Sequence, residues 1–319
     1  MIWLIGAKGM LGTHVARLLT EKDLFWTGSG SEVDISNPAA VENFITSTET
    51  NYYLSSHKKF SNPKERKINW IINCAAYTAV DNAENDEEKA RAVNTTGALN
   101  LARAARNHGA KLIHISTDYV FDGTAKVPYT EADKKNPTGV YGRTKSDGED
   151  AICSSMSQYY ILRTAWLYGF YGKNFVYTMT KLFNSKDEIR VVEDQFGTPT
   201  YCGDLASAIL MIIEKSEKAT SVFGKNSAPA YGIYHFTNEG QTSWFDFAKK
   251  IYAIGKKCGR VTKDCTITGC TTAEYGAKAP RPAYSVLSKE KIQKELRIKI
   301  PDWEQSLKEF MSDKRFEIQ

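Results

Sequence analysis

Strand-like and helix-like patterns of apolar residues alternate along the first half of the chain. The apolar run from Ile2 to Ile5 predicts a strand, and apolar residues at i, i+4, i+7 and i+8 between Leu11 and Leu19 predict a helix after it. A stretch rich in Ala, Glu, Lys and Arg, from Glu84 to His108, predicts a long helix with a glycine stop at Gly109. Further strands are expected at 24–27, 70–73 and 111–116. This alternation is typical of an α/β fold, a Rossmann-type doubly wound parallel sheet.

The rest of the chain is less regular. Ser36-Asn37-Pro38 has the capping side chains and the proline of a helix start, whereas the polar stretch 46–69 shows no period and is expected to be an inserted loop or small hairpin. Later elements are expected to be a strand at 159–167 and helices at 203–215 and 244–254. The expected domains are a dinucleotide-binding Rossmann domain at 1–170, to which segments within about 201–237 return, and a smaller α/β substrate-binding lobe, mainly 171–319.

The composition is that of an ordinary globular protein, and it limits the classes of function. The 319 residues include 42 Lys+Arg and 37 Asp+Glu, a net charge of +5, with 42% apolar and 25% charged residues. Basic residues form no clustered stripe and apolar residues form no membrane span, so we expect neither nucleic acid nor a membrane as a partner. The apolar run at the start is too short for a signal peptide, which favours a cytoplasmic protein. The cysteines and histidines show no metal-ligand spacing, and we expect no metal site.

Three glycines near the start of the chain form the first candidate binding motif. Gly6, Gly9 and Gly12 form a GxxGxxG that follows the first expected strand and opens the first expected helix. Glycines allow a tight turn and a close approach of the backbone to a pyrophosphate, and the helix N-terminus offers free N–H groups and a positive dipole. The motif in this context predicts a dinucleotide site, and the alternative is a merely structural strand-to-helix turn.

A tyrosine and a lysine four residues apart, Tyr141 and Lys145, would project from one face of a helix. A charge about 4 Å from the phenol contributes ~4 kcal/mol at an effective dielectric constant of about 20, enough to lower the tyrosine pKa by about three units. Such a phenol is an efficient proton donor to a developing alkoxide. The pair follows a strand that ends in Ser116-Thr117-Asp118, at the edge where open α/β sheets bind ligands. Tyr-x-x-x-Lys alone is uninformative, but its combination with the glycine loop and the Ser/Thr strand end is specific.

These residues and motifs resemble the extended short-chain dehydrogenase/reductase superfamily, and within it the family of dTDP-4-dehydrorhamnose reductases. The resemblance covers nearly the whole chain. It is carried by the glycine loop and by the segments NCAAYTAVD (73–81), STDYVFDG (116–123), YGRTK (141–145), RTAWLYG (163–169), DQFGTPT (194–200) and RPAYSVL (281–287). The resemblance implies the NAD(P)H-dependent reduction of the 4-keto group of dTDP-4-dehydro-L-rhamnose to dTDP-L-rhamnose.

The resemblance also implies roles for single residues. Tyr141 would protonate the 4-keto oxygen, Lys145 would lower the pKa of Tyr141 and hold the nicotinamide ribose, and Thr117 would hydrogen-bond the carbonyl oxygen. The positions expected to contact the cofactor are Gly6, Gly9, Met10, Leu11, Gly12, Asp34, Ile35, Ala75, Ala76, Tyr77 and Thr78, besides Tyr141 and Lys145. The positions expected to hold the dTDP-sugar are Thr117, Asp118, Tyr119, Trp166 and Arg281. For Tyr119 and Trp166, a purely structural aromatic packing role is the alternative.

Two other functions stay open. One is a nucleotide-sugar epimerase or dehydratase of the same superfamily; dehydratases generally carry further acidic residues beside the hydroxyl near the tyrosine, and here Asp118 is the only neighbouring carboxylate in the sequence. The other is a non-catalytic dinucleotide-binding subunit that resembles the regulatory subunit of methionine adenosyltransferase. The intact Thr117, Tyr141 and Lys145 favour the reductase.

The sequence favours NADPH as the cofactor, with NADH tolerated. Folds that prefer NAD usually place a carboxylate at the end of the second strand, where it binds the ribose hydroxyls. Here the expected strand 24–27 runs into Gly28-Ser29-Gly30-Ser31, whose hydroxyls can donate to a 2′-phosphate, and Lys8 adds a positive charge. The oligomeric state stays open, with a homodimer as one option. So does a bridging metal, because His14 is expected on the exposed side of its helix.

Overall fold

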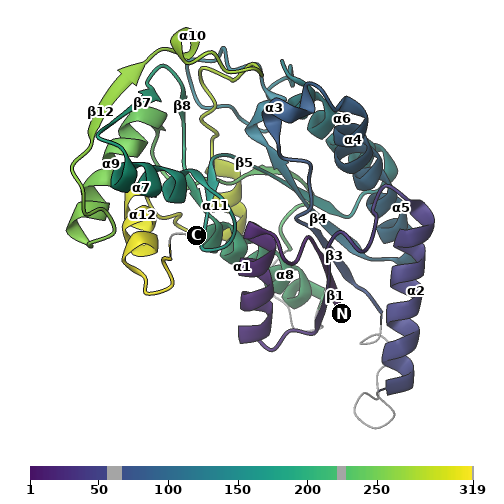
Figure 1. The fold of residues 1–319 in the computed structure, drawn as a ribbon. Coiled ribbons are helices and arrows are strands. Elements are labelled where there is room, and N and C mark those ends of the chain that lie inside the picture. Colours follow the sequence, from purple (N-terminus) through teal and green to yellow (C-terminus); the bar gives the residue numbers. More distant parts are fainter. Residues whose placement is uncertain (56–66, 221–227, 318–319) are drawn as a thin grey trace. The chain divides into compact units, whose positions relative to one another are not determined.

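The chain divides into two compact units in the computed structural model, which describes residues 1–55, 67–220 and 228–317 (Figure 1). Unit 1 comprises Met1–Ser116, Val140–Leu162 and Ala230–Ile233. Unit 2 comprises Thr117–Gly139, Arg163–Pro229 and Tyr234–Gln319. Both units are therefore assembled from segments that are distant in the sequence.

A six-stranded sheet has the strand order β10-β5-β4-β3-β1-β2. Its strands are β1 (Ile2–Ile5), β2 (Trp26–Ser29), β3 (Trp70–Asn73), β4 (Lys111–Thr117), β5 (Tyr159–Thr164) and β10 (Gly232–His235). The β1–β2, β1–β3 and β3–β4 pairs are parallel, and Ile5 lies level with Ser29 on one side and with Asn73 on the other. The carboxyl ends of these strands therefore share one edge, which is where open α/β folds bind ligands. The expected α/β fold with a parallel sheet is confirmed.

The core of unit 1 lies between the strands and the helices that follow them. These helices are α1 (Met10–Glu21), α2 (Pro38–Ser55), α3 (Val80–Ala83), α4 (Glu87–Arg91), α5 (Ala98–His108) and α6 (Val140–Ser155). Strand residues such as Trp3, Ile71 and Leu112 form one buried cluster with residues of α2, α5 and α6. Neighbouring strand residues point to the opposite face because side chains alternate along a strand, and α1 lies on that side (Figure 1).

Unit 2 is a mixture of helices and short strands. Its helices are α7 (Phe175–Ser185), α8 (Cys202–Thr220), α9 (Trp244–Lys257), α10 (Thr272–Tyr275), α11 (Glu290–Leu296) and α12 (Trp303–Ser312). Within its described residues, β6 (Leu167–Tyr168) pairs with β9 (Thr200–Tyr201), β7 (Glu188–Val192) with β12 (Thr266–Cys270), and β8 (Phe196–Gly197) with β11 (Thr242–Ser243). Its largest core is rich in aromatic side chains, including Tyr168, Phe247 and Phe310. This is the C-terminal α/β region that the sequence predicts.

Two helical predictions need correction. Residues 46–55 are not part of a loop, because α2 continues to Ser55; residues 56–66 lie outside the described part of the chain. The helix expected at 84–108 is interrupted, since α4 leads into a π-helical segment, η2 (Ala92–Gly97), before α5. The glycine stop is confirmed: Gly109 has φ +70°, in the left-handed region that favours glycine. The helix start at Pro38 is also confirmed, with the Asn37 side chain accepting from the N–H of Ala39 (3.0 Å).

Three smaller predictions were also wrong. The second strand begins at Trp26 and extends to Ser29, so it lies two residues later than expected. His14 is buried rather than exposed, and burial lowers its pKa to about 4. The strand expected at 159–167 is divided, because β5 ends at Thr164 and the backbone of Trp166 turns into the left-handed region, with φ +49°, before β6.

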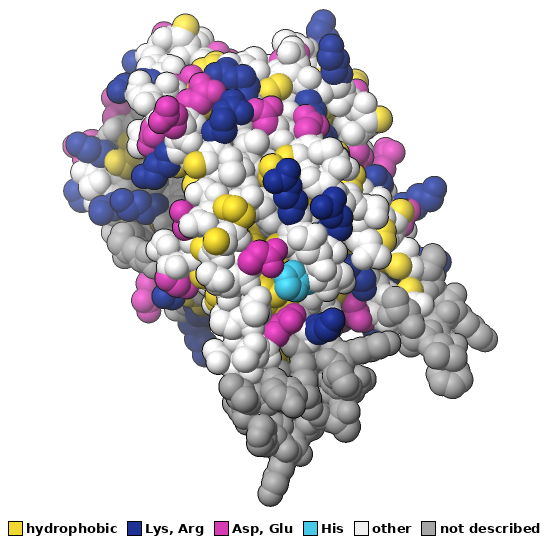
Figure 2. Space-filling view, turned by 90° about the vertical axis from the view of Figure 1, so that its right-hand side faces the viewer, with side chains coloured by type: hydrophobic (Ala, Val, Ile, Leu, Met, Phe, Trp, Pro, Cys, Tyr) yellow, Lys and Arg dark blue, Asp and Glu magenta, His cyan; other side chains and the backbone are white. Residues whose placement is uncertain are grey.

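The surface of the described residues carries charges of both signs. On the face shown in Figure 2, Lys and Arg side chains are interspersed with Asp and Glu rather than gathered in one patch. No helix in the described ranges is long and apolar enough to cross a membrane.

Candidate active site

The glycine loop connects β1 to α1 in unit 1 and leaves no room for side chains. Gly6 has φ +74°, and a Cβ there would lie 3.0 Å from the backbone nitrogen of Ala75, at the end of β3. A Cβ at Gly12 would collide with the carbonyl of Gly6 and the backbone of Ala7. Gly9 is the N-cap of α1, so the N–H groups of the following turn have no acceptor within the helix. The loop therefore has the close backbone and the free donors that a pyrophosphate requires.

Two asparagines that the sequence analysis did not identify as site residues fix the backbone that follows β3. Asn73 accepts the N–H of Ala75 on its Oδ1 (3.0 Å). Asn94, in the π-helical segment η2, accepts the N–H of Tyr77 (2.9 Å) and donates to the hydroxyl of Thr144 (3.1 Å). The small side chains expected to contact the cofactor, Ala75 and Ala76, lie in this fixed segment.

The end of β2 differs from the expectation for the cofactor. Ser29 is 2% exposed, and its hydroxyl accepts the indole N–H of Trp3 (2.9 Å). Glu32 places a carboxylate at this strand end after all, because its Oε1 accepts the N–H of Gly30 (2.6 Å). Hydrogen bonds from the backbone N–H groups of Glu32 itself and of Gly30 and, less strongly, the charge of Lys8 lower the pKa of Glu32.

The turn before α2 contains the next two expected cofactor contacts. Asp34 is exposed, and its Oδ1 accepts hydrogen bonds from the N–H (2.9 Å) and hydroxyl (2.7 Å) of Ser36. The side chain of Ile35 is 6% exposed and belongs to the core of unit 1. A contact from Ile35 to a ligand would therefore use its backbone.

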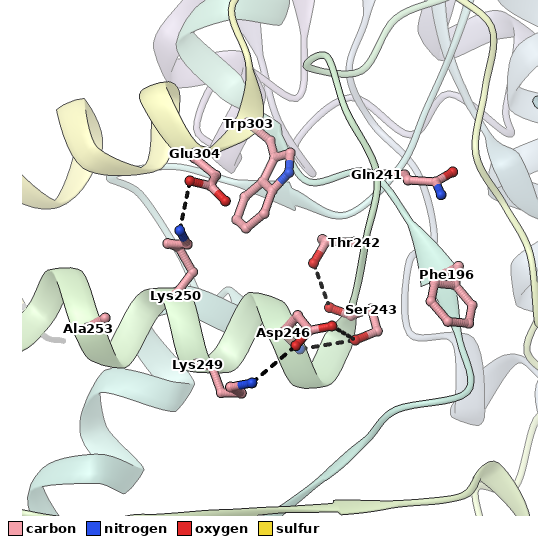
Figure 3. Close-up of a pocket in the computed structure, with 10 residues that line it drawn as sticks. All are labelled: Phe196, Gln241, Thr242, Ser243, Asp246, Lys249, Lys250, Ala253, Trp303 and Glu304. Atoms are coloured by element: carbon pink, nitrogen blue, oxygen red, sulfur yellow. Dashed lines mark hydrogen bonds and ion pairs between the residues drawn. The ribbon is translucent and has the colours of Figure 1, made fainter.

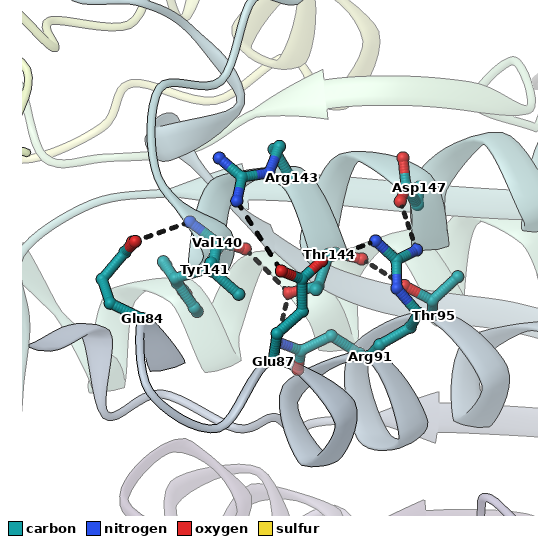
Figure 4. Close-up of polar contacts among 10 residues, drawn as sticks. Glu84, Glu87, Arg91, Thr95, Val140, Tyr141, Arg143, Thr144 and Asp147 are labelled. Atoms are coloured by element: carbon teal, nitrogen blue, oxygen red, sulfur yellow. Dashed lines mark hydrogen bonds and ion pairs between the residues drawn. The ribbon is translucent and has the colours of Figure 1, made fainter. Parts of the chain in front are cut away.

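Tyr141 and Lys145 both lie on α6, as expected, one turn apart. The start of this helix is held from outside, since Glu84 accepts the N–H of Val140 (2.8 Å) and the hydroxyl of Thr95 donates to the carbonyl of Thr144 (2.8 Å) (Figure 4). The ring of Tyr141 packs against a small apolar cluster from α3, α4 and α6. On the outer side, Arg91 pairs with Asp147 (2.8 Å) and Glu87 (3.0 Å). Several independent bonds thus fix the helix that carries the pair.

Lys145 is 1% exposed, and its ammonium or amine group has two hydrogen-bond contacts. Its Nζ lies 2.6 Å from the carbonyl oxygen of Ile115 and 3.2 Å from Nε2 of His114, both on β4. Nδ1 of His114 lies 3.0 Å from Nδ2 of Asn73. Burial lowers the pKa of Lys145 to about 8, against the opposing charge of Glu149. His114 was not predicted as a site residue; a polar side chain inside the apolar run 111–116 was the available signal.

Unit 2 begins with Thr117, the last residue of β4, and Asp118, which follows it. The hydroxyl of Thr117 donates to Oδ1 of Asp118 (2.9 Å) and accepts the N–H of Tyr119 (3.2 Å). Oδ2 of Asp118 is buried and accepts no hydrogen bond among the described residues. Burial raises the pKa of Asp118 to about 6, and the hydroxyls near it, of Ser285 and Thr117, limit the rise. A buried, unused carboxylate oxygen can accept a hydroxyl group of a ligand.

Trp166 and Arg281 are the other expected substrate residues in unit 2. The indole of Trp166 stacks on that of Trp244, with the ring centroids 3.6 Å apart, and it packs against Gly197, where a Cβ would lie 2.7 Å from the ring. Arg281 is partly exposed and donates to the carbonyl of Ala279 (3.3 Å). Both of these side chains are held by their own unit.

Unit 2 also has a pocket that the sequence did not indicate (Figure 3). Its volume is about 570 Å³, and it lies beside the first turns of α9. Lys249 and Lys250 line it, but they pair with Asp246 (3.4 Å) and Glu304 (2.7 Å). Each of the two lysines is therefore paired with a carboxylate. Among the described residues, no group of three or more His, Cys, Asp or Glu side chains could hold a metal ion.

Known proteins match this chain over almost its full length. A family model described as the RmlD substrate binding domain matches residues 1–316. A dTDP-4-dehydrorhamnose reductase from Aggregatibacter actinomycetemcomitans is 40% identical over 307 residues, 95% of each chain. The crystal structure of a dTDP-4-dehydrorhamnose reductase from Clostridium acetobutylicum is 38% identical, covers 97% of this chain and 98% of that one, and has a TM-score of 0.83. The crystal structure of the Bacillus anthracis dTDP-4-dehydrorhamnose reductase in complex with NADP is 35% identical, covers 97% of each chain and has a TM-score of 0.82.

Proposed function

This chain belongs to the dTDP-4-dehydrorhamnose reductase (RmlD) family, and from that premise we propose that it reduces the 4-keto group of dTDP-4-dehydro-L-rhamnose to dTDP-L-rhamnose with NAD(P)H. The observation that carries the proposal is the match to reductases at 40% identity over 95% of the chain. The arrangement of Tyr141 and Lys145 on one fixed helix supports it. The test is NADPH oxidation upon addition of dTDP-4-keto-6-deoxyglucose together with its 3,5-epimerase. Lack of oxidation by the folded protein would contradict the proposal.

Proton transfer, hydrogen bonding to the carbonyl oxygen and binding of the sugar are assigned to different residues. When bound, a nicotinamide cofactor would supply the hydride for the carbonyl carbon. Tyr141 supplies the proton to the 4-keto oxygen, and Lys145, once charged, lowers the pKa of Tyr141. The hydroxyl of Thr117 donates to the same oxygen, for which it must give up its hydrogen bond to Asp118. Oδ2 of Asp118 accepts a sugar hydroxyl, and Tyr119 and Trp166 hold the sugar.

The cofactor is held by the residues along the carboxyl edge of unit 1. The first turn of α1, with the glycine loop before it, binds the pyrophosphate through backbone N–H groups. Asp34 and the backbone of Ile35 contact the adenosine end. The segment 75–78, which follows β3, would line the cofactor, and Lys145 would hold the nicotinamide ribose. The tight turn that supports this fit rests on Gly6 and Gly12, where a Cβ would crowd the backbone of Ala75 or collide with that of Gly6 and Ala7.

A nucleotide-linked sugar is the proposed substrate, because the segment 194–200 and Arg281 suit a large anionic group, the nucleotide diphosphate, which a free sugar lacks. We expect Arg281→Met to raise KM for the nucleotide sugar about 10-fold or more, since binding energy from a remote charge contributes to both affinity and rate. Arg103→Met, an exposed arginine on α5, is the matched control and should leave KM unchanged. Steady-state kinetics measure both. Equal activity on the free 6-deoxy-4-keto sugar would contradict this assignment.

NADPH is the proposed preferred cofactor, with NADH accepted. The NADP complex of the Bacillus anthracis relative and the exposed Lys8 support this preference, while Glu32 opposes it through its negative charge. We therefore expect Glu32→Gln to raise the ratio of kcat/KM for NADPH over NADH several-fold, because a carboxylate repels the 2′-phosphate. Glu88→Gln, on an exposed turn of α4, should leave the ratio unchanged. A wild-type ratio that clearly favours NADH would contradict the preference.

The alternatives from the sequence are separated by the same assays. An epimerase or dehydratase would convert a nucleotide sugar without net oxidation of NADPH. A regulatory subunit would bind the dinucleotide without turnover. The absence of nucleic-acid and membrane partners, a cytoplasmic location, the domain limits and a homodimer stay predictions.

A further inference from the structure

A chain of hydrogen bonds in unit 1 runs from the backbone at the end of β3 to the amine of Lys145. It joins the N–H of Ala75 to Oδ1 of Asn73 (3.0 Å), Nδ2 of Asn73 to Nδ1 of His114 (3.0 Å), and Nε2 of His114 to Nζ of Lys145 (3.2 Å). Asn73 and His114 are each 1% exposed, so water does not replace a mismatched contact. Every contact in the chain must therefore pair a donor with an acceptor.

The backbone fixes the direction of this chain. A backbone N–H can only donate, so the atom of Asn73 that faces Ala75 is its carbonyl oxygen, and its NH2 group faces His114. Nδ1 of His114 must then accept. A neutral imidazole whose Nδ1 accepts carries its proton on Nε2, and that N–H points at Nζ of Lys145.

An ammonium group cannot accept this bond, because it has three donors and no lone pair. An uncharged amine can accept the N–H of His114 and still donate to the carbonyl of Ile115 (2.6 Å). With a charged Lys145, either Nδ1–H of His114 would face the NH2 group of Asn73, or the flipped amide would turn its NH2 group toward the N–H of Ala75. The uncharged amine is thus the form that satisfies all four contacts.

We propose that His114 donates its Nε2–H to an uncharged Lys145 in the cofactor-free protein, and that it is thereby the positioning residue that sets when Lys145 carries its charge. The ionisable groups around the amine are Glu149 on α6, whose carboxylate accepts the hydroxyl of Ser116 (2.6 Å), and the thiol of Cys74. The charge of Glu149 raises the pKa of Lys145, whereas burial and the proton donated by His114 favour the uncharged amine. The catalytic consequence rests on the role proposed above for Lys145, but the hydrogen-bond direction does not.

The direct test is the tautomer of His114, observed by nuclear magnetic resonance on cofactor-free protein with ¹⁵N-labelled histidine near pH 9, where a Lys145 with a pKa of about 8 is mostly uncharged. The signal is assigned by its loss in His114→Gln. We expect a neutral ring with the proton on Nε2. A ring with its proton on Nδ1, or with both nitrogens protonated, would overturn the proposal whether or not the protein proves to be a reductase.

The matched variants are His114→Gln and His114→Met. A glutamine can donate an amide N–H to Lys145 and accept from Asn73 on its oxygen, as the histidine does, whereas methionine has a similar length and can do neither. Loss of the donated bond removes support from the uncharged amine, so the alkaline limb of the pH profile of kcat/KM should move up by about one pH unit in His114→Met. It should stay in place in His114→Gln. Equal shifts in the two folded variants would overturn the proposal.

Discussion

Replacement of Tyr141 by phenylalanine is expected to reduce kcat by about 10²–10⁴-fold, the usual contribution of a positioned general acid. The ring packs against the small cluster of Ala83, Ala90 and Val140, and phenylalanine keeps that packing. The change therefore removes the proton donor without disturbing α6. NADPH binding, measured by fluorescence titration, should remain close to that of the wild type.

The control for this variant is Tyr275→Phe, which removes the same phenol oxygen from a side chain that is 58% exposed on α10. It should have wild-type kinetics. Near-wild-type turnover in Tyr141→Phe would refute the assignment of Tyr141 as the acid.

The second large effect is expected for Lys145→Met, which should lower kcat by about 10²-fold or more and also raise the Kd for NADPH. Without the charge, the pKa of Tyr141 returns toward its ordinary value of about 10, and the phenol becomes a poor acid near neutral pH. The carbonyl of Ile115 and Nε2 of His114 also lose their partner, at a cost of about 1–3 kcal/mol for each buried polar group left unpaired. Thermal unfolding should therefore show a lower Tm.

Lys181→Met on α7 is the comparison, because that lysine is exposed. The two roles of Lys145 are separated by measuring Kd and the single-turnover rate independently. If cofactor binding weakens but the rate at saturating NADPH stays unchanged, Lys145 acts only on the ribose.

The sequence predicted the parallel sheet and the helix of the Tyr–Lys pair because both depend on local patterns. Apolar runs such as Trp70–Asn73 and the glycines around α1 signal their own environment. The outer half of α2 could not be predicted in this way. Among the described side chains, the contacts of α2 with the core end at Ile45, and residues 46–51 are all polar.

The candidate site was predicted residue by residue, but its hydrogen bonds were not. Glu32 was passed over because the second strand was placed two residues early, which moved the strand end away from that carboxylate. The bond from Thr117 to Asp118 joins sequence neighbours, but it depends on side-chain directions that no spacing rule supplies. His114 and Asn73 are 41 positions apart in the sequence, and only the β3–β4 register makes them neighbours.

The π-helical turn at Ala92–Gly97 has a consequence for how this chain tolerates insertions and deletions. A π turn absorbs one extra residue in an α-helix, because the wider turn leaves the helices on either side at the angle that they would have without it. Deleting one residue there would therefore restore a regular helix without turning α4 relative to α5. The residues within the turn would move to new directions, since each residue rotates an α-helix by about 100°. Asn94 would then lose its hydrogen bonds to Tyr77 and Thr144, although its side chain was unchanged. The length of this segment therefore determines where Asn94 points.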